Sequence, residues 1–109
     1  MKIGALALGA FLSGILFIIL VILAACESNS RGAGIYRSQR CPECHTLKGK
    51  GGAGGPNLTY VGGKRSRDYI VQQIKDPSYH NADTAMPSFR DKLSDQEIND
   101  LADYLSGLK

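Results

Sequence analysis

The chain has 109 residues, of which 43% are hydrophobic, 21% charged and 7% aromatic, and it contains no tryptophan. This length allows one small domain and excludes a two-domain enzyme. The formal net charge is +3, which, with so few aromatic residues, does not predict nucleic-acid binding. A domain this small usually needs a disulfide, a metal or a large cofactor to complete its core, so we expect a non-protein group in the fold.

The charges are distributed unevenly along the chain. Residues 26–75 contain nine Lys and Arg against three Asp and Glu, whereas residues 76–109 contain three against seven. Such a separation can steer a protein toward an acidic partner. Solvated faces of mixed sign explain the pattern equally well.

The amino-terminal segment has the outline of a secretory signal: Lys2, then 23 uncharged residues, then small residues. Its end, Leu23-Ala24-Ala25-Cys26, resembles the lipobox of bacterial lipoproteins, in which cleavage leaves a lipidated cysteine as the first residue. We therefore expect residues 1–25 to be a signal peptide and Cys26 to be lipidated. A retained anchor is the main alternative, because 23 helical residues span roughly 35 Å, more than the ~30 Å hydrocarbon core. Simple cleavage to a soluble protein is the third reading, and all three place the folded part outside the cytoplasm.

The segment after Cys26 is polar and rich in Gly and Ser (residues 27–34, ESNSRGAG). It predicts a flexible tether over residues 26–34, followed by a folded domain over residues 35–109. No alternation typical of strands has useful length, so we expect helices joined by irregular loops.

The motif CPECH at residues 41–45 indicates the chemistry. Its two cysteines lie three residues apart on one helical turn, and His45 follows at once. This spacing is that of covalent haem attachment, in which each thiol adds to a vinyl group and the adjacent imidazole reaches the iron. The motif therefore predicts haem c held by Cys41 and Cys44, with His45 as an iron ligand.

The motif has three other interpretations, each with its own requirement. A thioredoxin-like pair needs a preceding strand in a βαβ setting, which this chain lacks. A zinc site needs four ligands, and beyond the motif only His80 remains, at a spacing typical of no common zinc module. A disulfide between so close a pair would close too small a loop to stabilise much.

A second axial ligand is expected if the iron transfers electrons. Met86 follows His45 by 41 residues and lies in a proline-containing loop, where a core methionine would be unusual. We predict that it is the distal ligand. The alternatives are His80, which lies in a polar stretch typical of exposed histidines, and a Met86 that only fills a gap in the core.

Two amphipathic helices and a loop are predicted after the motif. Ser66 is expected to cap a helix over residues 67–75, and Ser94 and Glu97 form a capping-box pattern that opens a helix ending at Gly107. The predicted inner residues are Tyr69, Ile70, Ile74, Ile98, Leu101, Ala102 and Leu105.

The five glycines of residues 49–55 predict a loop, which we expect to pack against the haem. The spacing of these glycines does not match the phosphate-binding pattern.

Residues 34–109 resemble the class I monohaem c-type cytochromes of the small bacterial kind. The resemblance rests on an aromatic-led helix that runs into CPECH, a Gly-Pro-Asn-Leu segment at residues 55–58, the Met86-Pro87 loop, and a carboxy-terminal helix with Tyr104 near its end. The chain departs mildly from the pattern, because Tyr36 precedes the first motif cysteine by five residues rather than four.

The resemblance implies an all-α fold of three or four helices around a covalent haem, preceded by the apolar amino-terminal helix. It implies that the carbonyl of Pro56 accepts a hydrogen bond from His45 and that Tyr104 lies where the last helix crosses the first.

The function expected from this reading is that of a one-electron carrier between membrane respiratory complexes on the outer side of the cytoplasmic membrane. A haem subunit fixed in a larger oxidase or reductase is the alternative. An open-site haem enzyme is the third, and would require that Met86 does not bind iron; with both axial positions filled, no small-molecule substrate is expected at the iron.

Overall fold

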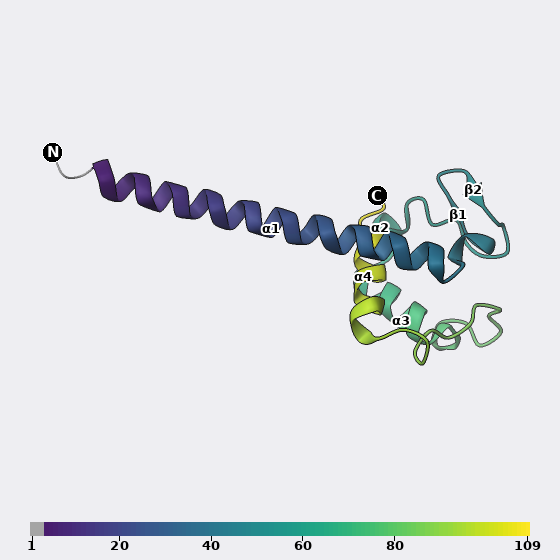
Figure 1. Cartoon of the computed structure of the whole chain (residues 1–109). Coiled ribbons are helices and arrows are strands. Elements are labelled where there is room, and N and C mark those ends of the chain that lie inside the picture. Colours follow the sequence, from purple (N-terminus) through teal and green to yellow (C-terminus); the bar gives the residue numbers. More distant parts are fainter. Residues whose placement is uncertain (1–3) are drawn as a thin grey trace.

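The computed structural model describes residues 4–109 of the chain, with the side chains of residues 9–27 and 29–109. The charged start of the predicted signal, Lys2, lies outside them. One long helix projects from a small helical domain at the carboxy-terminal end of the chain (Figure 1). The expectation of an all-α fold with an apolar amino-terminal helix is confirmed. The elements are α1 (Gly4–Ser38), η1 (Cys41–Glu43), β1 (Thr46–Leu47), β2 (Lys50–Gly51), α2 (Val61–Lys64), α3 (Arg67–Lys75), η2 (Pro77–Tyr79) and α4 (Asp95–Ser106).

The segment predicted as a flexible tether, residues 26–34, is helical and forms part of α1, so that prediction is wrong for its conformation. Its carboxy-terminal part packs on α4. The guanidinium of Arg31 lies 3.3 Å from the carboxylate of Asp100, and Gly32 lies against the Asp100 backbone. These tertiary contacts favour helix in a sequence whose Gly and Ser content favours coil.

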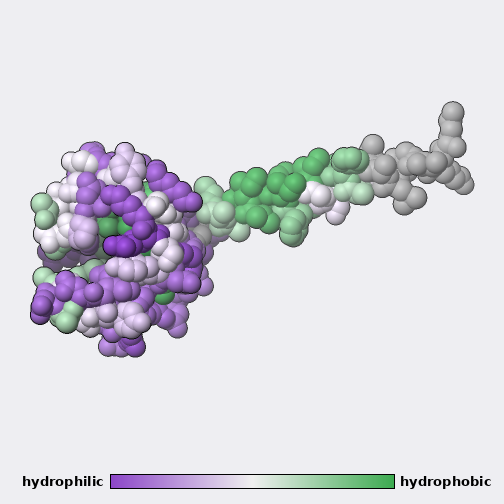
Figure 2. Space-filling view, turned by 180° about the vertical axis from the view of Figure 1, so that it is seen from behind, coloured by the Kyte–Doolittle hydropathy of each residue, from purple (hydrophilic) through white to green (hydrophobic). Residues whose placement is uncertain are grey.

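The amino-terminal part of α1 is apolar and exposed. The stretch Gly9–Ser38 is long and apolar enough to cross a membrane, and none of its most apolar window is buried by the rest of the protein. Figure 2 shows this hydrophobic shaft against the mainly hydrophilic surface of the domain. An amino-terminal signal sequence also meets this criterion of length and hydropathy, so the helix is consistent with either a signal peptide or a membrane anchor.

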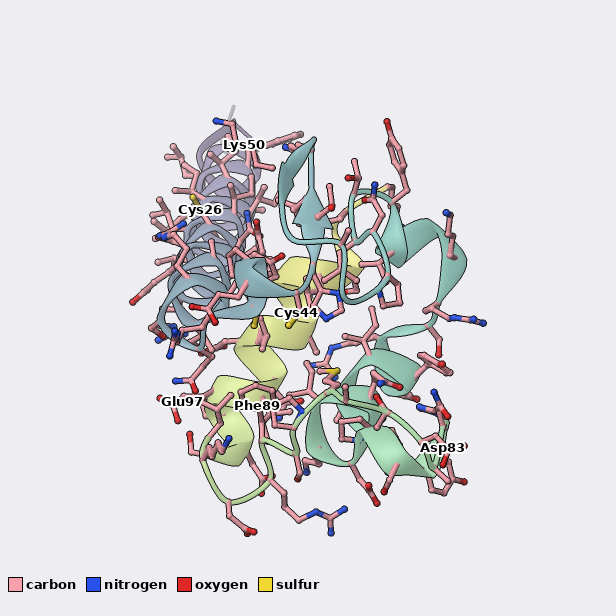
Figure 3. All side chains as sticks on the ribbon, turned by 90° about the vertical axis from the view of Figure 1, so that its right-hand side faces the viewer. Cys26, Cys44, Lys50, Asp83, Phe89 and Glu97 are labelled. Carbon is pink, nitrogen blue, oxygen red and sulfur yellow. The ribbon has the colours of Figure 1, made fainter. Side chains whose placement is uncertain are left out.

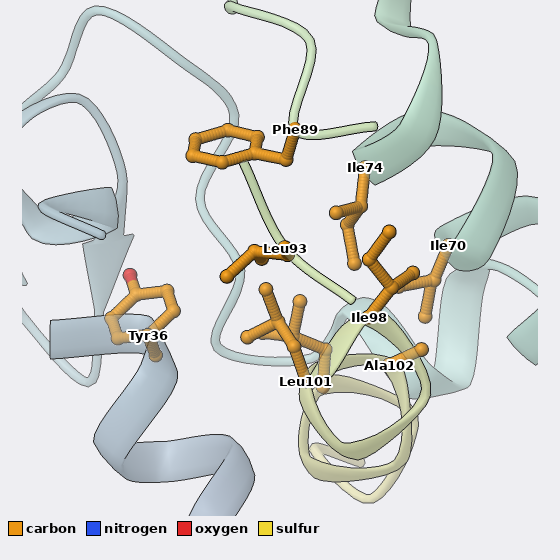
Figure 4. Close-up of a cluster of buried hydrophobic side chains, with 9 residues drawn as sticks. Tyr36, Ile70, Ile74, Phe89, Leu93, Ile98, Leu101 and Ala102 are labelled. Atoms are coloured by element: carbon orange, nitrogen blue, oxygen red, sulfur yellow. The ribbon is translucent and has the colours of Figure 1, made fainter. Parts of the chain in front are cut away.

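The core of the domain lies where α1, α3 and α4 meet (Figure 4). Tyr36 of α1 packs beside Tyr104 of α4, with 6.0 Å between ring centroids, as expected from the resemblance. The buried hydrophobic residues are Tyr36, Ile70, Ile74, Phe89, Leu93, Ile98, Leu101, Ala102 and Leu105. Every predicted inner residue is among them except Tyr69, which is half-buried.

Both predicted caps are present. The Ser66 hydroxyl accepts a hydrogen bond from the backbone N–H of Tyr69 at the start of α3. At the start of α4, the Ser94 hydroxyl accepts from the N–H of Glu97, and the Glu97 carboxylate accepts from the N–H of Ser94. These caps satisfy backbone donors that have no partner within the helix.

The glycine-rich loop begins with a feature that the sequence analysis did not predict, a hairpin of two-residue strands. Thr46 pairs with Gly51 and Leu47 with Lys50 in an antiparallel register. Its turn has positive φ angles at Lys48 and Gly49. Strands this short carry no detectable alternation, which is why the pattern predicted only a loop.

Candidate haem site

The domain contains a cavity of about 850 Å³, lined mainly by side chains from residues 39–58 and 69–89. The residues predicted to bind haem all line it: Cys41, Cys44, His45, Pro56 and Met86. Figure 3 views the domain from the end opposite the apolar shaft and places Cys44 between the hairpin side and the α3 side. The structure therefore brings together, from two separate stretches of chain, the groups that the sequence singled out.

The two motif cysteines are positioned by a sharp turn after α1. Arg40 adopts a left-handed conformation, with φ of 64°, and its guanidinium Nε lies 2.6 Å from the carboxylate of Glu43. The helix η1 follows, and the backbone N–H groups of Cys44 and His45 both donate to the carbonyl of Cys41, at 3.2 and 3.0 Å. This single turn places both thiols on the cavity.

The two thiols differ in their surroundings. Cys44 is exposed, whereas Cys41 is half-buried. Burial raises the pKa of the Cys41 thiol to about 11; the nearby Cys44 also raises it, while a backbone hydrogen bond opposes the shift.

The imidazole of His45 is held from behind by the loop after the hairpin. Its Nδ1 lies 2.8 Å from the carbonyl oxygen of Pro56, so Nδ1–H donates and the lone pair of Nε2 stays available to a metal. The Cα of Gly55 approaches the ring so closely that a Cβ there would lie 2.6 Å from Cε1 of His45. Only glycine fits this position without moving the ring.

Met86 reaches the cavity from the loop after η2. Its backbone N–H donates to the Thr84 hydroxyl at 3.2 Å, and its Sδ accepts a hydrogen bond from Nε2 of Gln73 at 3.6 Å. The same loop is tied to the end of α3, because the Ser88 hydroxyl donates to the carbonyl of Lys75 at 2.6 Å. The thioether is half-buried and lines the cavity.

His80, the rival ligand of the sequence analysis, also lines the cavity and is half-buried rather than exposed. Its ring stacks on Tyr69, with centroids 3.9 Å apart, and its Nδ1 lies 2.9 Å from Oε1 of Gln73. Gln73 is a site residue that the sequence patterns did not predict. Its position three residues after Ile70 and one before Ile74 puts it beside the apolar stripe of α3, and that was the signal available.

The cavity and its donors fit a covalent haem. A C-x-x-C pair of thiols, an imidazole with its Nδ1 already committed and a thioether all line one cavity, and Gly55 leaves the imidazole unobstructed. The zinc interpretation is not supported, because residues 4–109 as described hold no group of three or more His, Cys, Asp or Glu that could bind a metal ion.

This helical fold and this set of groups define a monohaem c-type cytochrome, a class that carries covalently bound haem c and transfers electrons rather than catalysing reactions. The chain belongs to the family described as "Cytochrome C oxidase, cbb3-type, subunit III", which matches residues 27–105. It is also 32% identical over 82 residues to the protein named "Cytochrome c-555" from Methylococcus capsulatus. That match covers 74% of this chain and 63% of the relative, so the chain spans less than two thirds of the relative's length.

Proposed function

We propose that this protein is a membrane-tethered one-electron carrier, located on the outer side of the cytoplasmic membrane, that passes electrons between respiratory complexes. The observation that carries the proposal is the convergence of Cys41, Cys44, His45 and Met86 on one cavity.

The residues divide the work of holding the haem. Cys41 and Cys44 would form the two thioether bonds, and His45 and Met86 would be the axial ligands. When bound, the haem supplies a single reversible electron at its iron, and methionine in place of a second histidine raises the potential. With both axial positions filled by protein, no site is left there for a small-molecule substrate.

The rest of the site serves orientation and solvent exclusion. The carbonyl of Pro56 fixes the plane and tautomer of the His45 ring, which is a common support for a metal-binding imidazole. Apolar side chains of the cavity, among them Leu58, Ile70 and Phe89, lower the local polarity. Low polarity disfavours the more highly charged oxidised state, so this lining also raises the potential.

The amino-terminal segment supports attachment to a membrane in either of two ways. Cleavage before Cys26 and lipidation would leave only six residues before Gly32, which packs on α4; as helix they span about 9 Å. A retained α1 would be a transmembrane anchor continuous with the domain. Both arrangements keep the domain close to the membrane surface, on the extracytoplasmic side to which such a signal directs a protein.

The partners are redox proteins that approach the cavity. Lys64 and Arg65 are exposed and line it, so they are suited to meet an acidic surface. Contacts between electron-transfer proteins are small and transient, which suits a carrier that must leave one complex and reach another.

A second candidate is a haem subunit fixed in a larger oxidase, which the printed description of the matched family favours. Gentle detergent extraction from the membrane distinguishes the two. A carrier elutes alone, at the size of one chain in its detergent micelle, whereas a fixed subunit elutes with a stoichiometric set of partners.

The ligand set is tested by visible spectroscopy of the full chain, produced together with haem-attachment machinery. We expect a reduced c-type spectrum and, in the oxidised protein, the far-red absorption band of methionine bound to iron. Met86→Ala should abolish that band and lower the potential while the haem stays covalently attached. A wild-type haem spectrum without the far-red band that changes in His80→Ala but not in Met86→Ala would instead assign the distal role to His80. A protein that attaches no haem would refute the proposal.

A further inference from the structure

A chain of contacts connects His80 to the sulfur of Met86 through one amide. His80 Nδ1 lies 2.9 Å from Oε1 of Gln73, and Nε2 of the same amide lies 3.6 Å from Sδ of Met86. The His80 ring is held in place by stacking on Tyr69, at 3.9 Å between centroids and 17° between planes. The guanidinium of Arg65 covers the Tyr69 ring, 4.7 Å from its centroid.

The amide of Gln73 can face this environment in two orientations, which exchange its oxygen and nitrogen. In the observed one, Oε1 must accept from His80, so Nδ1 of His80 carries a proton, and the amide N–H points at the thioether. In the reversed one, Oε1 would face the sulfur of Met86. Both atoms carry lone pairs and neither carries a proton, so they could not form a hydrogen bond. An Nδ1–H donor on His80 therefore selects the orientation that gives Met86 a hydrogen bond.

We infer that His80 is a positioning residue for Met86: it holds the Gln73 amide so that its N–H donates to the Met86 sulfur and raises the potential of the site. The inference rests on the proposed function, because it takes Met86 as the iron ligand. It gives His80, the alternative distal ligand, a different task, two contacts away from the sulfur of Met86.

The effect on the potential follows from the chemistry of a thioether. Sulfur has two lone pairs, so a hydrogen bond from Gln73 leaves the other available for the iron. A hydrogen bond from the amide N–H withdraws electron density from the sulfur. This disfavours the electron-poorer oxidised state of the iron more than the reduced state. The positive end of the amide dipole acts in the same direction. Removing the hydrogen bond should lower the potential.

The test is a double-mutant cycle on the haem-loaded full chain, read out as the reduction potential and as the position of the far-red ferric band. The variants are Gln73→Leu, His80→Phe and the pair combined. Phenylalanine keeps a flat ring that can stack on Tyr69 but has no donor. A fourth variant, His80→Asn, is the rescue, because its amide nitrogen can replace Nδ1. Covalent haem content and thermal unfolding of each variant show that it is folded.

We expect Gln73→Leu and His80→Phe each to lower the potential and shift the band, and the pair to shift no further than Gln73→Leu alone. His80→Asn should return the potential and the band most of the way to their wild-type values. Two outcomes would overturn the inference: an unchanged potential in His80→Phe, or a shift by His80→Phe of the same size in the Gln73→Leu background. A wild-type protein without the far-red band would instead refute the ligand set, so the two failures are distinguishable.

Discussion

Gly32 of α1 lies directly against the backbone of Asp100 of α4, so closely that a Cβ on Gly32 would fall 2.2 Å from the Asp100 carbonyl oxygen. The same Cβ would lie 2.5 Å from Cβ of Tyr104. This contact sets how near α1 and α4 can cross. It also makes the residues just after Cys26 part of the domain rather than a free connection to the membrane.

The crossing predicts that Gly32→Ala is strongly destabilising. The new methyl group must displace backbone atoms of α4, at a cost of about 1–3 kcal/mol or more. Gly34→Ala is the matched control, because nothing lies within 4 Å of its Cβ position, and alanine in a helix is favoured over glycine by about 0.5–1 kcal/mol. In thermal unfolding of the haem-loaded protein in detergent, Gly32→Ala should lower the melting temperature and Gly34→Ala should raise it slightly. Equal melting temperatures would contradict the crossing.

The close approach of Gly55 to His45 predicts a defect in the site rather than in the fold. In Gly55→Ala the methyl group would lie 2.6 Å from Cε1 of His45, so the ring must rotate and weaken its 2.8 Å hydrogen bond to Pro56. We expect a perturbed haem absorption spectrum and an altered potential. Gly54→Ala serves as the control, since its Cβ would stand 4.0 Å from the Cys44 sulfur, an ordinary contact. A Gly55→Ala spectrum identical to that of Gly54→Ala would show that the ring is not confined here.

The capping box of α4 predicts a loss of stability in Ser94→Ala. The substitution removes the acceptor for the backbone N–H of Glu97 and should cost about 1 kcal/mol. Ser94→Thr keeps a hydroxyl in place and should lose much less. Denaturant unfolding of both variants measures the difference. Because neither Ser94 nor Glu97 lines the cavity, the far-red band should be unchanged in each variant.

The pair of Lys75 and Asp95 joins the end of α3 to the start of α4 and predicts a small pH dependence. The Lys75 ammonium lies 2.8 Å from the Asp95 carboxylate, and this hydrogen bond, with the charge of Lys75, lowers the pKa of Asp95 in the folded protein. The pair therefore stabilises the fold at pH values above about 3.9, the pKa of the carboxyl in the unfolded chain. The stabilisation is lost as the pH falls through the lower pKa of the folded protein.

The corresponding measurement compares melting temperatures of the wild type and Asp95→Asn between about pH 6 and about pH 2. The wild type should have a slightly higher melting temperature than Asp95→Asn, and the difference should be small because the carboxylate is exposed. This difference should shrink as the pH falls and weaken with added salt. An advantage that stays constant over this range would exclude the pair as its source.

Much of this protein is predictable from local sequence patterns. The two capped helices were placed by Ser66 and Ser94, because a cap and the residues it bonds are neighbours in the chain. The CPECH motif is equally local: one helical turn determines that Cys41, Cys44 and His45 face the same cavity. Their roles as haem ligands are predictions, which the visible spectrum of the full chain tests.

The features that were missed depend on partners distant in the sequence. Gly and Ser content predicted a flexible tether over residues 26–34, yet Arg31 and Gly32 find their partners at Asp100, almost 70 residues later. The polar stretch around His80 predicted an exposed ring, but Tyr69 on α3 provides the surface on which that ring stacks.

The capped helices α3 and α4 and the CPECH turn thus follow from the sequence alone, because each rests on residues within a turn or two of one another, and the order of such motifs along the chain indicates the class of the protein. Contacts between distant residues instead determine that α1 continues into the domain, that Gly55 confines the His45 imidazole and that Gln73 lies between His80 and Met86. The physical reason is that packing brings together side chains whose spacing along the chain carries no period. Such contacts are selected by the shape of the assembled core.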